Sequence, residues 1–246
     1  MPAASGGYPV GMSDGVRRLP GIPLRFLQAW LAGRALRRRA AGIDTISGFV
    51  SLTHDFASHG LGIPALQHFV EVEPLLEMLA ADPPHALLEI GTAGGGSLFL
   101  WSRVAADDAV VVSIDLPWGR WGSGYPLTRA PLYRAFARAR QRVVLIRGDS
   151  HAAASRERVV RALAGRPLDF LFIDGDHTYE GARLDFELYA PLVRPGGIIA
   201  LHDIANETED VGVHRLWAEL RAAHPEARDL LAPPPAAKGI GVIRAV

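Results

Sequence analysis

The chain has 246 residues, of which 49% are hydrophobic and 21% are charged, as is usual for a globular protein. Its 26 basic and 26 acidic residues balance, so no overall charge draws it to nucleic acid or to anionic membranes. It has no cysteine, which excludes disulfides, thiolate metal sites and cysteine nucleophiles. We find no apolar run of membrane-spanning length and no signal peptide, so the cytoplasm is the expected location.

The N-terminal third of the chain predicts a tail followed by helices. Residues 1–22 are rich in Gly, Pro and Ser and lack periodicity, which is typical of a flexible tail. Residues 24–40 place apolar side chains at helical spacing between arginines and predict an amphipathic helix. Residues 42–64 carry several glycines and predict an irregular segment, whereas residues 65–81 predict a second helix that Pro74 breaks or kinks.

Residues 23–84 are therefore expected to form a helical extension ahead of a core domain at residues 85–246. The apolar stripe of the 24–40 helix can pack on a partner subunit or fold back on its own core. We expect the first arrangement, and with it a homo-oligomer in which the extension acts as a cap or an oligomerisation element.

From residue 86 onward, short apolar runs alternate with segments of helical periodicity. The expected strands cover residues 86–90, 109–114, 142–146, 169–173 and 197–201, with a short terminal β pair at 230–232 and 239–245. Alternation of this kind predicts an α/β fold, in which helices cover both faces of a mainly parallel sheet.

A glycine-rich turn joins the first of these strands to its helix. Glycines permit positive φ and close approach of a ligand, and the new helix offers unpaired N–H groups. The stretch 86–97 is neither the dinucleotide-binding GxGxxG motif nor a P-loop, so a tight structural turn remains an alternative. Glu89 ends the strand as an acid, which requires a cationic ligand or backbone N–H groups as partners.

Polar residues gather where the strands end, which is where ligands bind in parallel sheets. Those residues are Glu89, Asp115, Asp149, Asp174, His177, His202 and Asp203. A carboxylate at the end of the second strand can accept both ribose hydroxyls of a nucleoside, and one at the end of the third strand can reach the adenine amino group. Each of these acids could instead cap the helix that follows it.

The densest polar group follows the fourth and fifth strands. Asp174, His202 and Asp203 could converge on one divalent cation. His177 lies three residues after Asp174 and titrates near neutrality in its unperturbed state, so it is a candidate general base for a hydroxyl. In the alternative interpretation, the acids cap the next helix and the histidines only support them.

These residues resemble a class I S-adenosylmethionine-dependent methyltransferase over residues 67–246. The segment Glu89–Ser97, EIGTAGGGS, resembles the cofactor loop of catechol- and caffeoyl-CoA-type O-methyltransferases, although Ala93 replaces the second glycine of the commoner GxGxG form. Residues 169–180, DFLFIDGDHTYE, and 195–203, PGGIIALHD, are similar to the family that contains macrolide-sugar O-methyltransferases and cephalosporin hydroxylase-like proteins.

The resemblance implies a Rossmann-like, doubly wound sheet of seven strands with an antiparallel C-terminal strand, and S-adenosylmethionine as the cofactor. The implied cofactor-binding residues are Glu89, Gly91, Thr92, Gly95, Ser97, Asp115, Asp149, Ser150 and Asp174. It also implies magnesium or manganese at Asp174, His202 and Asp203, with His177 as the base. The sugar enzymes have an acid where this chain has His202, and an imidazole there allows another transition metal or none.

We therefore expect an O-methyltransferase that acts on a hydroxyl of a small sugar or phenol-like acceptor with the help of a divalent metal. The first alternative is a metal-independent methyltransferase that relies on His177 alone. An NAD-dependent oxidoreductase is disfavoured because the GxGxxG motif is absent. The last alternative is an inactive nucleoside-binding relative, since a fold does not by itself establish an activity.

Overall fold

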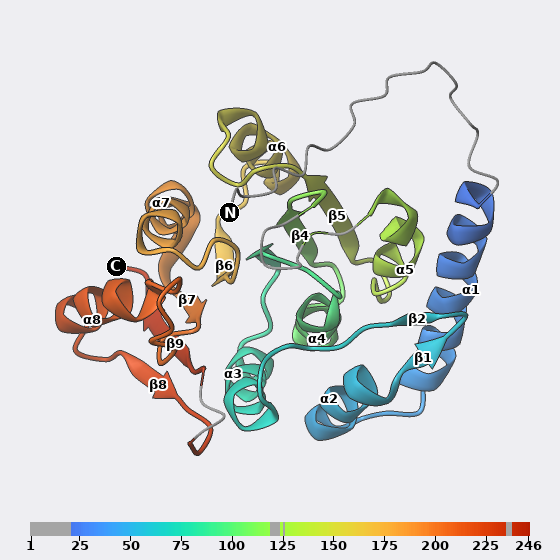
Figure 1. The fold of residues 1–246 in the computed structure, drawn as a ribbon, viewed down its shortest axis with the longest axis horizontal. Helices are drawn as coiled ribbons and strands as arrows, with labels where there is room; N and C mark the ends of the chain where they lie inside the picture. The colour runs from blue at the N-terminus through green and yellow to red at the C-terminus, as the bar shows by residue number, and fades with distance from the viewer. Residues whose placement is uncertain (1–20, 119–123, 125, 235–237) are drawn as a thin grey trace, which may run out of the picture.

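The computed structural model describes residues 21–118, 124, 126–234 and 238–246, so nearly all of the predicted 1–22 tail lies outside the described residues. Seven strands form one sheet in the order β5-β4-β3-β6-β7-β9-β8 (Figure 1). Their bounds are β3 (Ala86–Ile90), β4 (Val110–Asp115), β5 (Arg142–Arg147), β6 (Leu168–Ile173), β7 (Val193–His202), β8 (Arg228–Leu230) and β9 (Ile240–Arg244). Strands β3 to β7 run parallel, and β9 is antiparallel to both of its neighbours, which confirms the predicted seven-stranded sheet.

Helices cover both faces of the sheet (Figure 1). One face carries α1 (Ile22–Ala40), α2 (Ile46–Asp55), α3 (Phe69–Ala81), α4 (Gly96–Val104) and α5 (Ala130–Arg134), and the other carries α6 (Ala153–Leu163), α7 (Tyr179–Tyr189) and α8 (Val213–Ala223). Successive strand residues point to opposite faces, so Leu87 joins the first core and Leu88 joins the second. Two short 3-10 helices, Leu127–Arg129 and Ala190–Leu192, complete the fold.

The prediction of an irregular segment at residues 42–64 is wrong. The structure contains α2 there, followed by a small hairpin of β1 (Ala57–Ser58) and β2 (Leu61–Gly62). Thr45 caps α2, since its hydroxyl oxygen accepts the N–H of Gly48 at 3.2 Å. The glycines of this segment favoured an irregular structure in the sequence pattern, although the cap and the buried apolar residues of the helix are present. Helix α3 is also continuous through Pro74.

Helix α1 folds back on its own chain. It buries its small residues, and a Cβ added at Gly33 would lie only 2.6 Å from the Cβ of Ala135, just after α5. The early part of the helix leaves large apolar side chains exposed, namely Ile22, Leu24, Leu27 and Trp30. The predicted apolar stripe is thus divided between a packed inner face and an exposed outer face.

Strands β4 and β5 follow β3 toward one edge of the sheet, whereas β7 follows β6 toward the other edge. The strand order therefore reverses between the neighbouring strands β3 and β6. Such a switch point leaves a crevice at the carboxyl ends of the strands, where ligands bind in open α/β sheets. The polar strand-end residues predicted from the sequence therefore share one edge of the sheet. Among the described residues, no helix has the length and apolar character needed to cross a membrane.

Candidate active site

The glycine-rich turn between β3 and α4 presses closely against its neighbours. Gly91 has φ of +87°, and a Cβ at this position would lie 2.0 Å from the carbonyl oxygen of Asp174. Gly95, also at +87°, precedes α4, and a Cβ there would lie 2.5 Å from the ring of Tyr133. Only glycine combines this positive φ with so little space. The turn, residues 91–96, is called the glycine loop below.

Asp115, at the end of β4, fixes the glycine loop. Its Oδ2 accepts the N–H groups of Thr92 at 2.8 Å, Ala93 at 2.7 Å and Gly124 at 3.1 Å. Its Oδ1 accepts the N–H of Leu116 at 2.7 Å. Burial raises the pKa of the carboxyl above its usual range despite these donors. The residue predicted to hold ribose therefore also positions the backbone of the loop.

Glu89 lies beneath the glycine loop with none of its surface exposed. Its Oε1 accepts a hydrogen bond from the indole N–H of Trp101 at 2.9 Å, and its Oε2 has no hydrogen-bond partner among the described residues. Burial raises its pKa to about 8, although the side chains of Ser97, Thr92 and Trp101 lower it. The backbone N–H groups expected as partners of this acid are replaced by a tryptophan of α4.

A first cavity of about 260 Å³ lies beyond the ends of β3, β4 and β5. Ile90, Ile114 and Leu116 supply apolar walls. Four residues predicted to bind the cofactor also line the cavity, which are Gly91, Asp115, Asp149 and Ser150. Apolar walls with a few polar groups are suited to an aromatic base and its sugar.

His151, which also lines the first cavity, forms a pair that the sequence analysis missed. Its Nε2 lies 3.3 Å from Oδ1 of Asp185, a completely buried carboxylate on α7. The hydrogen bond to Asp185 raises the pKa of His151 to about 9, while burial opposes the shift. No local signal marks this pair, because the two residues lie on different elements.

A second cavity of about 240 Å³ lies beside the first, and Gly91 is the one residue that lines both in the part of the chain that the structure describes. Thr92 and Ser97 of the predicted cofactor set line it. Its wall also contains the predicted base and metal-binding residues, which are His177, Asp174, His202 and Asp203, and the unpredicted Gln67 and Lys238 are among its other lining residues. Glu89 and Gly95 of the predicted cofactor set line neither cavity.

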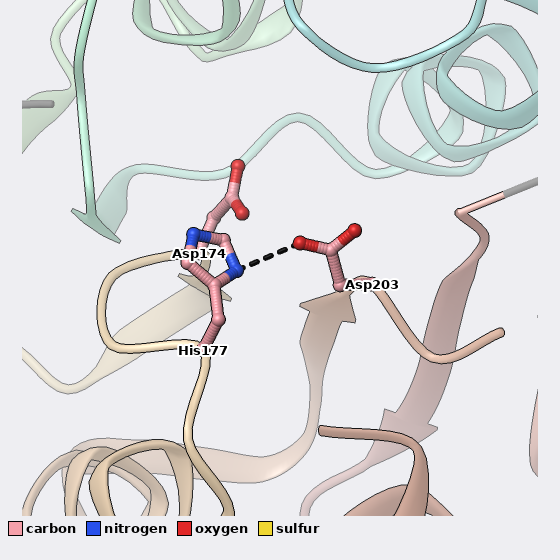
Figure 2. Close-up of side chains that lie close together, drawn as sticks. All are labelled: Asp174, His177 and Asp203. Atoms are coloured by element: carbon pink, nitrogen blue, oxygen red, sulfur yellow. Dashed lines mark ion pairs between the residues drawn. The ribbon is translucent and has the colours of Figure 1, made fainter. Parts of the chain in front are cut away.

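Asp174, His177 and Asp203 form a compact group in the second cavity, called the acid–histidine cluster below. One ligand atom from each residue lies within 4.8 Å of the other two, a spacing that could hold a metal ion. Figure 2 shows the His177 ring directed at Asp203, with the carboxylate of Asp174 beside them; the Nδ1–Oδ2 distance is 2.7 Å. The side chains come from the ends of β6 and β7 and from the segment before α7.

The grouping differs from the predicted metal set, which contained His202 and left His177 outside. His202 Nδ1 lies 3.0 Å from Oδ1 of Asp174, while its Nε2 is buried without a hydrogen-bond partner among the described residues. His202 Nδ1 also lies 3.9 Å from Oδ2 of Asp203, so this histidine approaches both carboxylates. The four predicted residues do come together, and their binding of a metal stays a prediction.

Charges within the cluster favour the protonated form of the two histidines and the ionised form of Asp203. Burial disfavours the charged form of His177, but the hydrogen bond to Asp203 and the charge of Asp174 outweigh it and raise the pKa. Burial likewise opposes ionisation of Asp203, yet His177, His202 and Lys238 together hold its pKa well below the usual range. A bound cation would compete with these protons.

Asp203 also has an unusual backbone, with φ of +64°. Neighbouring contacts hold it there: Asn206 Nδ2 donates to its Oδ1 at 3.1 Å, and the N–H of Ala205 donates to the carbonyl of Lys238 at 2.8 Å. Residues in this region are strained unless the surroundings enforce the conformation, and they concentrate at functional sites.

The N-terminal extension supplies two further polar residues that the sequence analysis missed. Gln67, which is 3% exposed, donates from Nε2 to Oδ2 of Asp174 at 2.7 Å, and its Oε1 has no partner among the described residues. Glu71 of α3 is fully buried and accepts the N–H groups of Ala232 and Gly239. Glu71 could have been noticed in the sequence, because it is an acid among the apolar residues of a predicted helix. No sequence pattern marks Gln67 as a functional residue.

Residues 88–204 match the family model of a methyltransferase domain. The uncharacterised protein y4gI of Sinorhizobium fredii is 29% identical over 145 residues, which cover 58% of this chain and 16% of that protein. The match thus spans only about one sixth of that relative's length.

Two solved structures are similar to the whole arrangement. The O-methyltransferase of Bacillus cereus, in complex with SAH, has a TM-score of 0.55 at 21% identity, covering 88% of this chain and 99% of that one. The MycE methyltransferase of the mycinamycin biosynthetic pathway, in complex with Mg and SAH, has a TM-score of 0.52 at 18% identity, covering 98% of this chain and 66% of that one. Nearly half of the chain therefore matches the model of a methyltransferase domain, and its sheet and helices have the Rossmann-like fold of these two solved methyltransferases.

Proposed function

We propose that the protein is an S-adenosylmethionine-dependent O-methyltransferase that methylates a hydroxyl of a small acceptor. The observation that carries this proposal is the meeting of two cavities at Gly91. One cavity is lined by the acids that end β4 and β5, and the other contains the acid–histidine cluster. A nucleoside compartment next to acid–base residues is what methyl transfer to a hydroxyl requires.

The residues around Gly91 fit S-adenosylmethionine, which supplies an electrophilic methyl group when bound. Oδ1 of Asp115 has a single backbone donor and can accept a ribose hydroxyl as well. Asp149 and Ser150 would face the adenine. Oε2 of Glu89 has no hydrogen-bond partner among the described residues and could pair with a polar group of the ligand.

His177 is proposed as the general base. Its Nδ1 contacts Asp203 at 2.7 Å, which fixes the orientation of the ring and stabilises the imidazolium that forms when Nε2 takes the hydroxyl proton. Asp203 raises the pKa of His177 above the usual value of a histidine. The neutral form of His177, which acts as the base, therefore becomes more populated as the pH rises through this raised pKa. Turnover should therefore increase with pH through the neutral range.

We also propose that a divalent metal ion assists the reaction. Two carboxylates and an imidazole form a donor set suited to magnesium or manganese, and Asp174, Asp203 and His202 would hold the ion while His177 acts as the base. Such an ion would lower the pKa of an acceptor hydroxyl. The metal-independent alternative also has a specific observation in its favour, because each aspartate already pairs with a histidine.

Calorimetry with SAH and with NAD tests the cofactor. We expect SAH to bind and NAD not to bind. The Asp115→Ala variant should bind SAH about 1–3 kcal/mol more weakly, since it leaves hydrogen-bonding groups unpaired. Tight binding of NAD, or no binding of SAH, would refute the proposal. Binding of SAH without methyl transfer to any hydroxylated acceptor would favour the inactive relative.

Single-turnover kinetics test the base. The His177→Ala variant should lower the rate of methyl transfer by roughly 10²–10⁴ while SAH affinity stays the same. His85→Ala is the matched control, since the His85 side chain is 63% exposed and lies away from both cavities. Near-normal turnover of His177→Ala would exclude the base.

Metal dependence is tested by activity in excess chelator and by direct titration with Mn²⁺. If the metal is required, the chelator should abolish activity, and Asp174→Asn should lose Mn²⁺ binding. Full activity in the chelator would favour the metal-independent enzyme, with Asp174 and Asp203 orienting the two histidines.

We further propose that the protein is a homo-oligomer that uses the outer face of α1. The exposed Leu24, Leu27 and Trp30 support this, since a partner subunit would remove them from water. Light scattering should report a mass above that of the 26.5 kDa monomer, and Leu27→Arg should reduce it. A monomeric wild-type protein would refute the proposal.

A further inference from the structure

A single lysine stands at the entrance to the acid–histidine cluster. Lys238 is the only lysine in the sequence, so the other 25 of the 26 basic residues are arginines. Its side chain is 52% exposed and lines both the second cavity and an adjoining groove. A chain that uses arginine at every other basic position has its one compact ammonium group beside the candidate active site.

The ammonium group is available to a ligand. Its Nζ lies 3.8 Å from Oδ1 of Asp203, which is beyond hydrogen-bond distance. That carboxylate already takes hydrogen bonds from His177 and Asn206. Among the residues that the structure describes, none accepts a hydrogen bond from Lys238 Nζ. An ammonium carries three N–H donors, so Asp203 alone does not satisfy it.

The peptide unit that follows Lys238 is held by two hydrogen bonds. Its carbonyl accepts the N–H of Ala205, which follows β7, at 2.8 Å. The next residue, Gly239, donates its N–H to the buried carboxylate of Glu71 at 3.0 Å. The cation therefore extends from a position that is fixed by both the core and α3, as a binding residue should be.

The adjoining groove offers an apolar surface beyond the cation. Leu66 and Phe69 line it and are 61% and 53% exposed, which is high for large apolar side chains. Glu71 also lines the groove, but it is buried and accepts two backbone N–H groups. A ligand lying in the groove would cover the apolar pair and pass Lys238 before it reached the cluster.

We propose that Lys238 binds a carboxylate of the acceptor, so that the substrate is a hydroxylated carboxylic acid with an apolar body. The carboxylate contacts Nζ, the apolar body covers Leu66 and Phe69, and the hydroxyl faces His177. An anion entering this cavity meets the repulsion of Asp174 and Asp203, and Lys238 adds a positive charge to that of the two histidines in offsetting it. The inference rests on the proposed methyltransferase function and specifies its substrate class.

The sole lysine permits a direct test by chemical labelling. The SAH-loaded protein is treated with an amine-selective acetylating reagent, and mass spectrometry follows the peptide that contains Lys238. The probes are 3,4-dihydroxybenzoate and its neutral amide, which differ only in the charged group. We expect the acid to slow acetylation of Lys238 several-fold relative to SAH alone, and the amide not to do so. The N-terminal amine of the same chain is the internal reference.

Affinity measurements with two variants complete the test. Wild-type protein loaded with SAH should bind the acid at least about tenfold more tightly than the amide. Lys238→Met should remove this preference, and Lys238→Arg should keep part of it, with SAH affinity and melting temperature unchanged in both. Equal protection by the two probes, binding of neither, or a preference that survives in Lys238→Met would overturn the inference. Failure of the wild-type protein to bind SAH would instead refute the proposed function.

Discussion

The buried carboxylate of Glu89 makes the stability of the protein dependent on pH. Its pKa is about 8 in the folded chain, against 4.5 for the unperturbed group. Between these two values the folded state holds a proton that the unfolded state has lost, so stability falls as the pH rises. The slope for one such group is about 1.4 kcal/mol per pH unit. Raising the pH from 5.5 to 7.5 should therefore remove about 3 kcal/mol of folding free energy through Glu89 alone.

The Glu89→Gln variant isolates this contribution, because glutamine has nearly the same shape and does not titrate. Urea unfolding of wild type and variant at pH 5.5, 6.5 and 7.5 gives the free energy of unfolding at each pH. The difference in unfolding free energy between Glu89→Gln and wild type should grow by about 3 kcal/mol in favour of the variant over this range. The contributions of histidines that titrate in both proteins cancel in this difference. Glu77→Gln, which changes an exposed carboxylate of α3, is the control for loss of one charge. A difference that does not change with pH would refute the reasoning.

Three further predictions follow from the same contacts. His151 has a pKa raised to about 9 by Asp185, so the stability that this pair contributes is present below pH 6.5 and lost as the pH rises through 9; His151→Ala should flatten the unfolding free energy between pH 7 and 10. Gln67→Leu removes a donor to the aspartate after β6, and should weaken Mn²⁺ binding or lower turnover about tenfold, with SAH affinity unchanged; equal kinetics would show that the contact is dispensable. Gly91→Ala should abolish SAH binding and lower the melting temperature, since its Cβ has no space, whereas Gly42→Ala, with nothing within 4 Å, should leave both unchanged.

Much of the candidate site could be predicted because its residues sit at recognisable places in the chain. Asp115, Asp149 and Asp174 each follow a short apolar run, and the carboxyl ends of parallel strands meet at one edge of the sheet. Glycines after β3 and a run of helical periodicity marked the loop. Helix α2 was missed because glycines in the surrounding segment outweighed its cap at Thr45.

The sequence by itself determined the alternation of strands and helices from residue 86 onward, the glycine loop and the set of polar residues at the strand ends. These follow from local properties, which are hydrophobic periodicity, backbone conformational freedom and capping. Only the tertiary structure decided that His177 pairs with Asp203 and His202 with Asp174, and that Gln67 and Lys238 reach the same cavity. Gln67 and Asp174 are 107 residues apart, and no local pattern encodes a contact that exists only after the helices and the sheet have packed.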